Sequence, residues 1–368
     1  MRNMRKTIKF ILIAAPVILI GAALLISKNA ESKAYYSNYS VISEIALNTS
    51  AKVYQGNEKI YVCTKNGTRA YDTDGGLVFD ISYSFDEPYV VSRKNAAAIT
   101  ETDGKKVYVV SEGGTANAYE TEYAIDMISV AENGTTAVLM ENGLKDIIRI
   151  YSFEGEILVE IGTESTRDGI PVGISLSPDG KKIITEYISY DGDTVKTKIT
   201  FYNTGEIGKN FIENIVGQRT VSGTAYKAEF LSNTRVGIFF PDNVIIYSMD
   251  EIPELLSETK ITDVYDINVG ENVLITEHKD DIYNLLIYDS GFNLASEVPN
   301  IAEYDSVIFG GSSEIIIKTG NLFTVYRKNG TKKFEATLPE STKNVFYGKN
   351  LRYFVVGQDS VRVISLEG

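Results

Sequence analysis

Eight short polar turns recur along the chain at nearly even intervals, each between two runs of apolar residues. Asparagine and aspartate suit hairpin turns because they tolerate positive φ. The turns centre on Asn57, Asn95, Asn133, Asp179, Asn233, Asn272, Ser312 and Asn350. Their spacings are 38, 38, 46, 54, 39, 40 and 38 residues, with a mean of about 42. This repeat, with only short apolar runs inside it, restricts the fold more than any other feature.

A second signal has the same period. An apolar run that ends at or near a tyrosine leads into a polar turn, often closed by glycine, and a further short run follows. The examples are RAYDTDGG (69–76), RIYSFEGE (149–156), TFYNTGE (200–206), IIYSMDE (245–251), LIYDSGF (286–292) and TVYRKNG (324–330). Each repeat therefore offers four strands, and no long amphipathic helix is visible after residue 40. Four strands in about 40–45 residues are typical of a β-propeller blade.

The repeat count predicts an all-β, eight-bladed β-propeller, with seven blades as the alternative if one turn does not mark a blade. A single four-stranded sheet cannot bury its two apolar faces, whereas sheets stacked around a ring bury both. The last repeat offers only three strands, NVFYG (344–348), LRYFVVG and VRVISL. We expect YSVISEIAL (39–47) to supply the fourth strand of that blade, so that the two ends of the chain close the ring.

The first 27 residues form a separate unit. Arg2, Arg5, Lys6 and Lys9 precede an uncharged run, residues 10–27, that reads FILIAAPVILIGAALLIS. This length is at the lower limit for a transmembrane helix. Because the preceding charges are all basic, the N-terminus is expected to be cytoplasmic and the rest of the chain extracytoplasmic. The predicted organisation is a cytoplasmic tail and anchor (1–27), a linker (28–38) and a propeller (39–368), in a single-pass protein of the cell membrane.

A cleaved signal peptide is the competing interpretation of this segment. Its best cleavage site, Ser32-Lys33-Ala34, lies well past the apolar run and contains a lysine, which favours an uncleaved anchor. A lipoprotein anchor is excluded because the single cysteine is Cys63. That residue lies in an apolar run, KIYVC, and is expected to be a buried hydrophobic residue and not a reactive thiol.

Charge narrows the range of partners. The net charge of −13 becomes −17 when the four basic side chains of residues 1–27 are set aside. So acidic a surface argues against nucleic acid and against anionic envelope polymers. It is compatible with simple solubility or with a cationic partner. With one His and one Cys, the sequence offers no multi-His or multi-Cys metal site, and no cofactor is expected.

The segment LSPDGKKIITEY (176–187) resembles the SPDG repeat of bacterial TolB-like and WD40-like propellers. The strands in which tyrosine, a turn and glycine follow one another are similar to those of quinoprotein-like propellers. An anchor followed by such repeats resembles an uncharacterised family of single-pass, membrane-anchored bacterial β-propeller proteins. Because the chain has no Trp, the WD dipeptide and the tryptophan docking motif are absent. The resemblance therefore implies a fold and a location, and it transfers no catalytic residue.

Motifs for catalysis are missing. The chain has no G-x-S-x-G, no P-loop and no dinucleotide-binding G-x-G-x-x-G. The segment Asp72–Gly75 is interpreted as a strand-connecting turn, because Tyr83 occupies the position where a calcium loop that starts at Asp72 needs an acid. The similar segment Tyr190–Asp193 is interpreted as a hairpin turn. His278 is expected at a strand edge or on the surface. Carboxylates are abundant, so an acid-catalysed glycosidase pair stays possible as an alternative.

The two longest spacings, 46 and 54 residues, flank the fourth repeat. The extra residues are assigned to GTESTRDGI (162–170), SYDGDTVK (189–196) and GQRTVSGT (217–224). In a propeller, loops that link blades and loops that join the middle strands lie on one face, and insertions gathered on a face favour a binding surface. The alternative is neutral variation in loop length. The candidate binding residues are Arg167, Asp168, Tyr190, Asp191, Asp193, Gln218 and Arg219.

The function predicted from these features is a non-enzymatic, membrane-anchored, extracytoplasmic propeller that binds or scaffolds a protein at the cell envelope. The expected partners are the membrane, through the N-terminal helix, and an envelope protein. The alternative is an envelope carbohydrate-active hydrolase or lyase that uses acidic residues at the propeller channel. Such an enzyme predicts carboxylates that converge at the channel mouth with raised pKa values. A sensor or accessory subunit of an envelope complex is a third option, which the sequence does not separate from the first.

Overall fold

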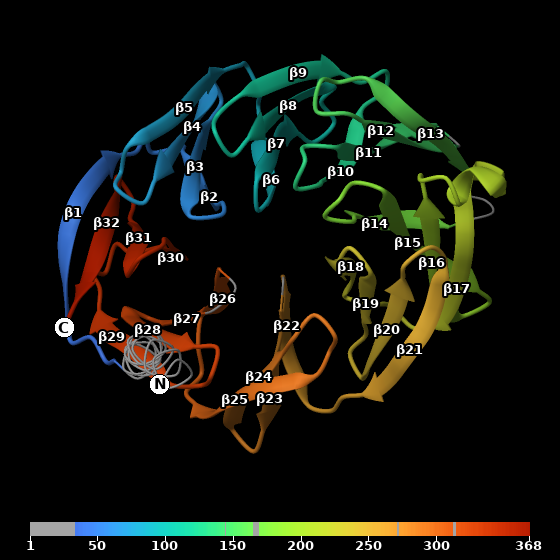
Figure 1. Ribbon diagram of the computed structural model, residues 1–368. Coiled ribbons are helices and arrows are strands. Elements are labelled where there is room, and N and C mark those ends of the chain that lie inside the picture. The colour runs from blue at the N-terminus through green and yellow to red at the C-terminus, as the bar shows by residue number, and fades with distance from the viewer. Residues whose placement is uncertain (1–33, 144, 165–168, 271, 312–313) are drawn as a thin grey trace, which may run out of the picture.

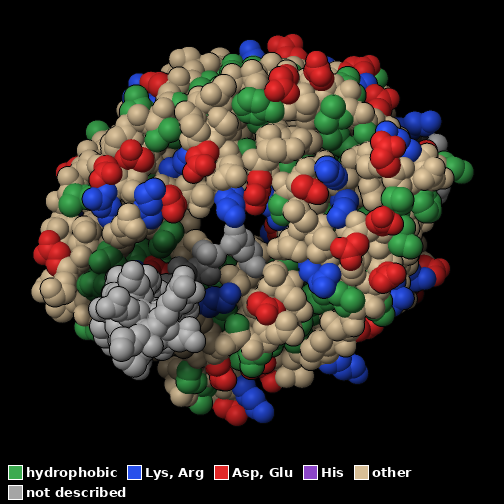
Figure 2. All heavy atoms as spheres, viewed as in Figure 1, with side chains coloured by type: hydrophobic (Ala, Val, Ile, Leu, Met, Phe, Trp, Pro, Cys, Tyr) green, Lys and Arg blue, Asp and Glu red, His purple; other side chains and the backbone are tan. Residues whose placement is uncertain are grey.

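A computed structural model shows a closed ring of eight four-stranded sheets around a central channel (Figure 1). It describes residues 34–143, 145–164, 169–270, 272–311 and 314–368. The prediction of an all-β, eight-bladed propeller is confirmed. Figure 2 shows the ring hollowed at its centre on the face in view, with acidic and basic side chains around the opening.

Seven blades are consecutive antiparallel sheets whose first strand lies nearest the channel. Blade 1 contains β2 (Lys52–Gln55), β3 (Lys59–Thr64), β4 (Gly67–Asp72) and β5 (Leu77–Ser82). Blade 2 contains β6 (Pro88–Arg93), β7 (Ala96–Glu101), β8 (Lys106–Ser111) and β9 (Ala116–Glu120). Blade 3 contains β10 (Ile125–Val130), β11 (Thr136–Asn142), β12 (Lys145–Tyr151) and β13 (Ile157–Glu164). Blade 4 contains β14 (Ile170–Leu176), β15 (Lys182–Asp191), β16 (Thr194–Asn203) and β17 (Ile215–Ser222).

The next three blades follow the same order. Blade 5 contains β18 (Lys227–Ser232), β19 (Arg235–Phe239), β20 (Asn243–Met249) and β21 (Pro253–Lys260). Blade 6 contains β22 (Val264–Val269), β23 (Val273–Lys279), β24 (Ile282–Tyr288) and β25 (Leu294–Ile301). Blade 7 contains β26 (Ser306–Gly310), β27 (Glu314–Thr319), β28 (Leu322–Arg327) and β29 (Lys332–Thr337).

Blade 8 is built from both ends of the described chain. It contains β30 (Asn344–Tyr347), β31 (Arg352–Val356) and β32 (Ser360–Glu367), and β1 (Asn38–Ala46) forms its outer strand. The ladder between β1 and β32 runs from the pair Asn38–Glu367 to the pair Ala46–Ser360. The predicted closure is therefore confirmed.

The hydrophobic cores lie between blades. The described residues form eight buried clusters, and each cluster joins the facing sheets of two neighbouring blades. Ile184 and Phe201 of blade 4, for example, pack with Phe230 and Ile238 of blade 5. Among these described residues no cluster lies within a single blade, so an isolated blade would expose its apolar faces and the ring is the stable arrangement.

The recurring turns occupy equivalent positions in their blades. Seven of the eight markers lie between the first and second strands of their blades, and Ser312 falls outside the described residues. The segments Asp72–Gly75 and Tyr190–Asp193 form strand-connecting turns, as expected. Cys63 is 1% exposed, and burial raises the pKa of its thiol to about 11. This agrees with its interpretation as a buried hydrophobic residue.

The expected anchor and most of the linker lie outside the described residues. Within the part of the chain that the structure describes, no helix has both the length and the apolar character needed to cross a bilayer. The chain already packs on the ring at Tyr36, whose backbone N–H donates to the carbonyl of Lys333 over 2.9 Å. The last residues of the expected linker, 28–38, are therefore part of the ring.

Candidate functional site

The antiparallel blades divide the connections between two faces. We call the face with the first-to-second and third-to-fourth strand connections the marker face, because it carries the recurring turns. The opposite face carries the second-to-third strand hairpins and the links between blades, and we call it the hairpin face. The candidate binding residues of the fourth repeat were expected to share the hairpin face.

The most prominent element of the hairpin face is the β15–β16 hairpin of blade 4. Its strands have ten residues each, whereas the equivalent strands β7 and β8 have six. Tyr190 lies next to the tip, opposite Val195, and is 70% exposed. Asp191 accepts a hydrogen bond from the Lys196 ammonium, which lowers the pKa of Asp191. The tip thus presents an aromatic ring beside a paired carboxylate.

The structure keeps only part of the predicted site together. Tyr190, Asp191 and Asp193 share the hairpin tip. Gln218 and Arg219 belong to the outer strand β17, so the assignment of residues 217–222 to a loop was wrong. Arg167 and Asp168 lie outside the described residues.

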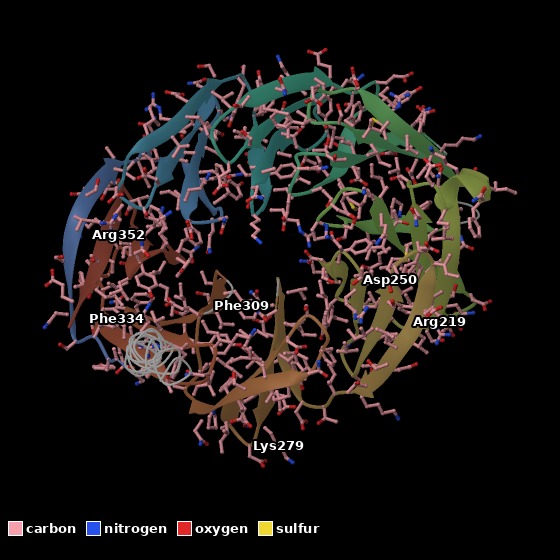
Figure 3. All side chains as sticks on the ribbon, viewed as in Figure 1. Arg219, Asp250, Lys279, Phe309, Phe334 and Arg352 are labelled. Carbon is pink, nitrogen blue, oxygen red and sulfur yellow. The ribbon has the colours of Figure 1, made fainter. Side chains whose placement is uncertain are left out.

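The two strand residues have partners at the rim. Gln218 Nε2 lies 3.4 Å from Thr200 Oγ1, to which it donates, and Arg219 lies 4.0 Å from a Glu258 carboxylate oxygen of blade 5. Figure 3 shows Arg219 at the outer edge of the ring, whereas Phe309 lies toward the centre. Gln218 and Arg219 therefore take part in blade contacts and are not part of the exposed hairpin tip.

Exposed apolar side chains surround the base of the hairpin. Ile170 pairs with Ile188 at the start of β14 and is 60% exposed, and Val172 follows it. Tyr226, in the link from blade 4 to blade 5, is 61% exposed. Ile170, Val172 and Tyr226 are not among the residues predicted from the sequence, which were polar and aromatic residues of the predicted loops. Together with Tyr190 they make the surface that we call the blade-4 patch.

A second insertion in blade 4 lies on the marker face. Residues 204–214 connect β16 to β17 and contain two short 3₁₀ helices, η1 (Gly208–Asn210) and η2 (Ile212–Asn214). Part of the long spacing between Asp179 and Asn233 therefore comes from this connection, not from residues 217–224. The sequence signal was the length of this connection and the apolar pair Phe211-Ile212 within it, because the corresponding connections are short and hold at most one large apolar side chain each.

Blade 6 carries an aromatic cluster on the hairpin face. His278 stacks on Tyr283 with ring centroids 4.1 Å apart, and Tyr265 and Tyr304 meet Tyr283 edge to face. His278 therefore packs at the end of a strand, consistent with the expectation for it. Tyr265 is 49% exposed, so one ring of the cluster is open to solvent.

Carboxylates with raised pKa values lie in several blades. In blade 3, burial raises the pKa of Asp126 and of Asp146, and nearby Glu141 adds to both effects. In blade 4, burial raises the pKa of Glu186 to about 7 against the opposing effect of the Ala228 backbone N–H. Asp146 and Glu186 are 7% and 4% exposed, so both are closed to a polymer substrate. Among the described residues, no three His, Cys, Asp or Glu side chains are placed to hold a metal ion.

The channel is narrowed by contacts between inner strands. Arg93 of β6 donates to the carbonyls of Leu176 in blade 4 and Phe230 in blade 5, over 2.9 and 2.8 Å. The hydroxyls of Ser129 and Ser175 accept the backbone N–H groups of Leu176 and Phe230, over 3.0 and 3.1 Å. These polar groups of the inner strands therefore form hydrogen bonds between blades and contribute to the structure of the ring.

Comparison with known proteins supports the fold. The solved structure of Chaetomium thermophilum Sqt1 bound to the N-terminus of the ribosomal protein L10 is similar, with 12% identity, a TM-score of 0.54 and coverage of 90% of this chain and 100% of that chain. The Dos1 propeller matches with 12% identity, a TM-score of 0.54 and coverage of 89% and 95%. At these identities the likeness shows the fold alone. A search of curated proteins finds no match.

One family model covers nearly the whole propeller. It matches residues 31–366, which include every strand of the ring except the last residue of β32, and it is described as a family of unknown function. The match extends from the segment before β1 to the last strand, so it includes both ends of the closing blade. The chain belongs to this family, DUF5711.

Proposed function

We propose that this protein is a non-enzymatic propeller, anchored outside the cytoplasmic membrane by residues 1–27, that binds a protein of the cell envelope through its hairpin face. The observation that carries the proposal is the blade-4 patch, where Tyr190 stands 70% exposed on an extended hairpin beside Tyr226 and Ile170. Exposed aromatic and aliphatic groups gathered on one face are typical of a binding surface. Sqt1, a propeller with the same fold, is bound to a segment of another protein, which is consistent with this use of the ring.

The entry of the chain supports the choice of face. Tyr36 bridges to Phe334, and β1 begins at Asn38 opposite Glu367, at the marker-face end of blade 8. A tether that reaches the ring on the marker face leaves the hairpin face directed away from the bilayer. The blade-4 patch is then accessible to a partner that approaches from the envelope.

Charge gives the chemistry of the partner. The described connections on the hairpin face are rich in carboxylates, which are Asp86, Glu87, Asp103, Glu122, Asp193, Asp242, Asp263, Asp280, Asp281, Glu303, Asp305, Glu340 and Asp359. Basic side chains there are fewer, namely Lys65, Lys105 and Lys343. Complementary charge steers association and excludes like-charged partners. The proposed partner is therefore a protein that presents basic residues around an apolar contact.

Site-specific crosslinking in cells tests this proposal. A photoreactive residue at position 190 is compared with one at position 322, because Leu322 is 38% exposed on the hairpin face of blade 7, away from the patch. We expect a discrete adduct from position 190 only, and Tyr190→Ala should lower recovery of that partner about tenfold, as at an interface hot spot. Equal labelling from both positions, or none from position 190, contradicts the proposal.

The blade-3 carboxylates favour the second candidate function, a carbohydrate-active hydrolase or lyase. Asp126 and Asp146 both have raised pKa values, to which the nearby Glu141 contributes, and of the two only Asp126 is exposed. The decisive variant is Asp126→Asn, because Asp126 lies on the inner strand β10 and is exposed. Turnover of an envelope glycan by the purified protein that Asp126→Asn abolishes, with no crosslinked partner, would replace the binding proposal.

A further inference from the structure

The connection between β16 and β17 exposes two large apolar side chains. Ile212 is 87% exposed, and Phe211 before it is 42% exposed. The other third-to-fourth strand connections are short and hold at most one large apolar side chain each, as Ile252 in residues 250–252, and those at 73–76 and 328–331 hold none. We call residues 204–214 the apolar tip. Exposed apolar groups on an inserted element require an explanation, because neither packing within the ring nor solubility favours them.

Hydrogen bonds hold the apolar tip in one conformation. The Asn203 side chain donates to the carbonyl of Glu251 in blade 5, over 2.8 Å, and accepts the backbone N–H of Gly205 over 2.9 Å. Asn214 donates back to the Asn203 carbonyl over 3.2 Å. The backbone of Glu213 has φ 54°, a left-handed conformation that turns the chain beside Ile212. The exposure of Ile212 is therefore built into an ordered element.

Apolar surface continues from the tip along the rim. The helix η2 lies against β13, whose first residues, Ile157 and Leu158, are 55% and 54% exposed. Lys209 pairs with Glu206 over 2.5 Å next to the apolar pair. The tip thus combines an apolar end with this ion pair and with the exposed carboxylate of Glu213, so its net charge is −1. Insertion of the apolar end places these charged groups at the level of the headgroups.

The tip and the tether share a face but lie at opposite sides of the ring. The tip belongs to blade 4 and the chain enters at blade 8, and blades four apart in a ring of eight face each other across the channel (Figure 1). Both elements lie at the marker-face ends of their strands. A bilayer that holds the tether is therefore next to the same face that carries the tip.

We propose that the apolar tip inserts Phe211 and Ile212 into the surface of the bilayer and forms a second attachment point, an inference that rests on the proposed anchoring by residues 1–27. Only residues 28–33 separate the apolar run from the first packed residues, and six residues span at most roughly 20 Å. The ring is thereby held close to the lipid. Burial of the two side chains removes apolar surface from water, which favours one tilt of a ring that is already tethered.

Because the chain has no Trp, the fluorescence of a single introduced Trp reports on its own position alone. Full-length Ile212→Trp is reconstituted in phosphatidylcholine vesicles and compared with Leu322→Trp, an exposed site on the hairpin face. Flotation with the vesicles reports anchoring, and quenching by phosphatidylcholine with brominated acyl chains reports contact of the indole with lipid. We expect a blue-shifted emission for the Ile212→Trp protein and about twofold quenching, with neither for the Leu322→Trp protein.

The outcomes separate the two proposals. If the protein does not float with vesicles, the proposed anchor is wrong and the insertion falls with it. If the protein floats but the indole at position 212 is not quenched, only the insertion is overturned. A blue shift without quenching by brominated lipid assigns the tip to a protein contact, either with a second copy or with another partner, and also overturns the insertion.

Discussion

The guanidinium of Arg93 in blade 2 donates a hydrogen bond to the backbone carbonyl of Phe230 in blade 5, over 2.8 Å. A second bond reaches the Leu176 carbonyl of blade 4, over 2.9 Å. One side chain on an inner strand thus connects three blades at the channel. The charged donor strengthens both bonds relative to neutral pairs.

Arg93→Met keeps much of the aliphatic length but removes both donors. We expect the free energy of unfolding to fall by roughly 1.5–3 kcal/mol, the typical worth of a hydrogen bond to a charged group. Urea denaturation followed by tyrosine fluorescence measures the change. The control is Arg219→Met, whose surface contact with Glu258 should be worth less than about 1 kcal/mol. Equal losses in the two variants contradict a bracing role for Arg93.

The closing strand offers a matched pair of isoleucines. Ile45 of β1 is 6% exposed and packs in the cluster between blades 8 and 1, whereas Ile42 on the same strand is 43% exposed. Ile45→Ala should lower stability by about 2–4 kcal/mol, and Ile42→Ala by less than about 1 kcal/mol. Thermal unfolding of the two variants checks the difference. Similar melting temperatures would mean that closure by β1 contributes little to the ring.

A buried polar triad joins blades 7 and 8. The Lys333 ammonium donates to Glu314 and, over 3.0 Å, to the Tyr353 hydroxyl, and that hydroxyl also donates to Glu314. Lys333→Met leaves the Glu314 carboxylate buried without its cation, and we expect a loss of about 3–5 kcal/mol. The double variant Lys333→Met with Glu314→Gln should recover part of this loss. A double-mutant cycle by urea denaturation measures the coupling, and strict additivity would contradict it.

Glu186 makes stability depend on pH. Burial raises the pKa of its carboxyl to about 7 in the folded protein, so the native state binds more protons than the unfolded chain between roughly pH 4.5 and 7. This contribution to stability is therefore present at low pH and is lost as the pH rises through 7. Its size is about 3 kcal/mol, from about 1.4 kcal/mol per unit of pKa shift.

Glu186→Gln removes the titration and keeps an acceptor for the Ala228 N–H. The variant should be more stable than the parent protein at pH 8, and the difference should shrink toward pH 5. Melting temperatures of both proteins across this range check the sign. A parent protein that gains stability relative to the variant between pH 6 and pH 8 would show that the carboxyl is charged in the fold.

The repeated strands and turns could be predicted from the sequence, whereas contacts between residues far apart in the chain could not. Hairpin turns such as those at Asn95 and Asn350 repeat a local conformation, so the number of blades could be predicted from their spacing. The same spacing indicated that the last repeat contains only three strands. Arg93 and Phe230 are 137 residues apart, and no local pattern marks such a contact. Gln218 and Arg219 were placed in a loop because a strand with polar outward residues resembles a connection. The apolar tip was not predicted because an apolar residue such as Ile212 looks the same in the sequence whether it is exposed in a loop or buried in a strand.

The antiparallel pairing of β1 with β32 determines how a tethered ring bears load. Under the proposed anchoring by residues 1–27, tension enters β1 at its marker-face end, next to Glu367, and acts along the strand. Every rung of the ladder from Asn38 to Ala46 then resists sliding at the same time, instead of opening one after another as in a peeled hairpin. A propeller closed in this way is mechanically strongest in the direction in which its own N-terminal segment pulls.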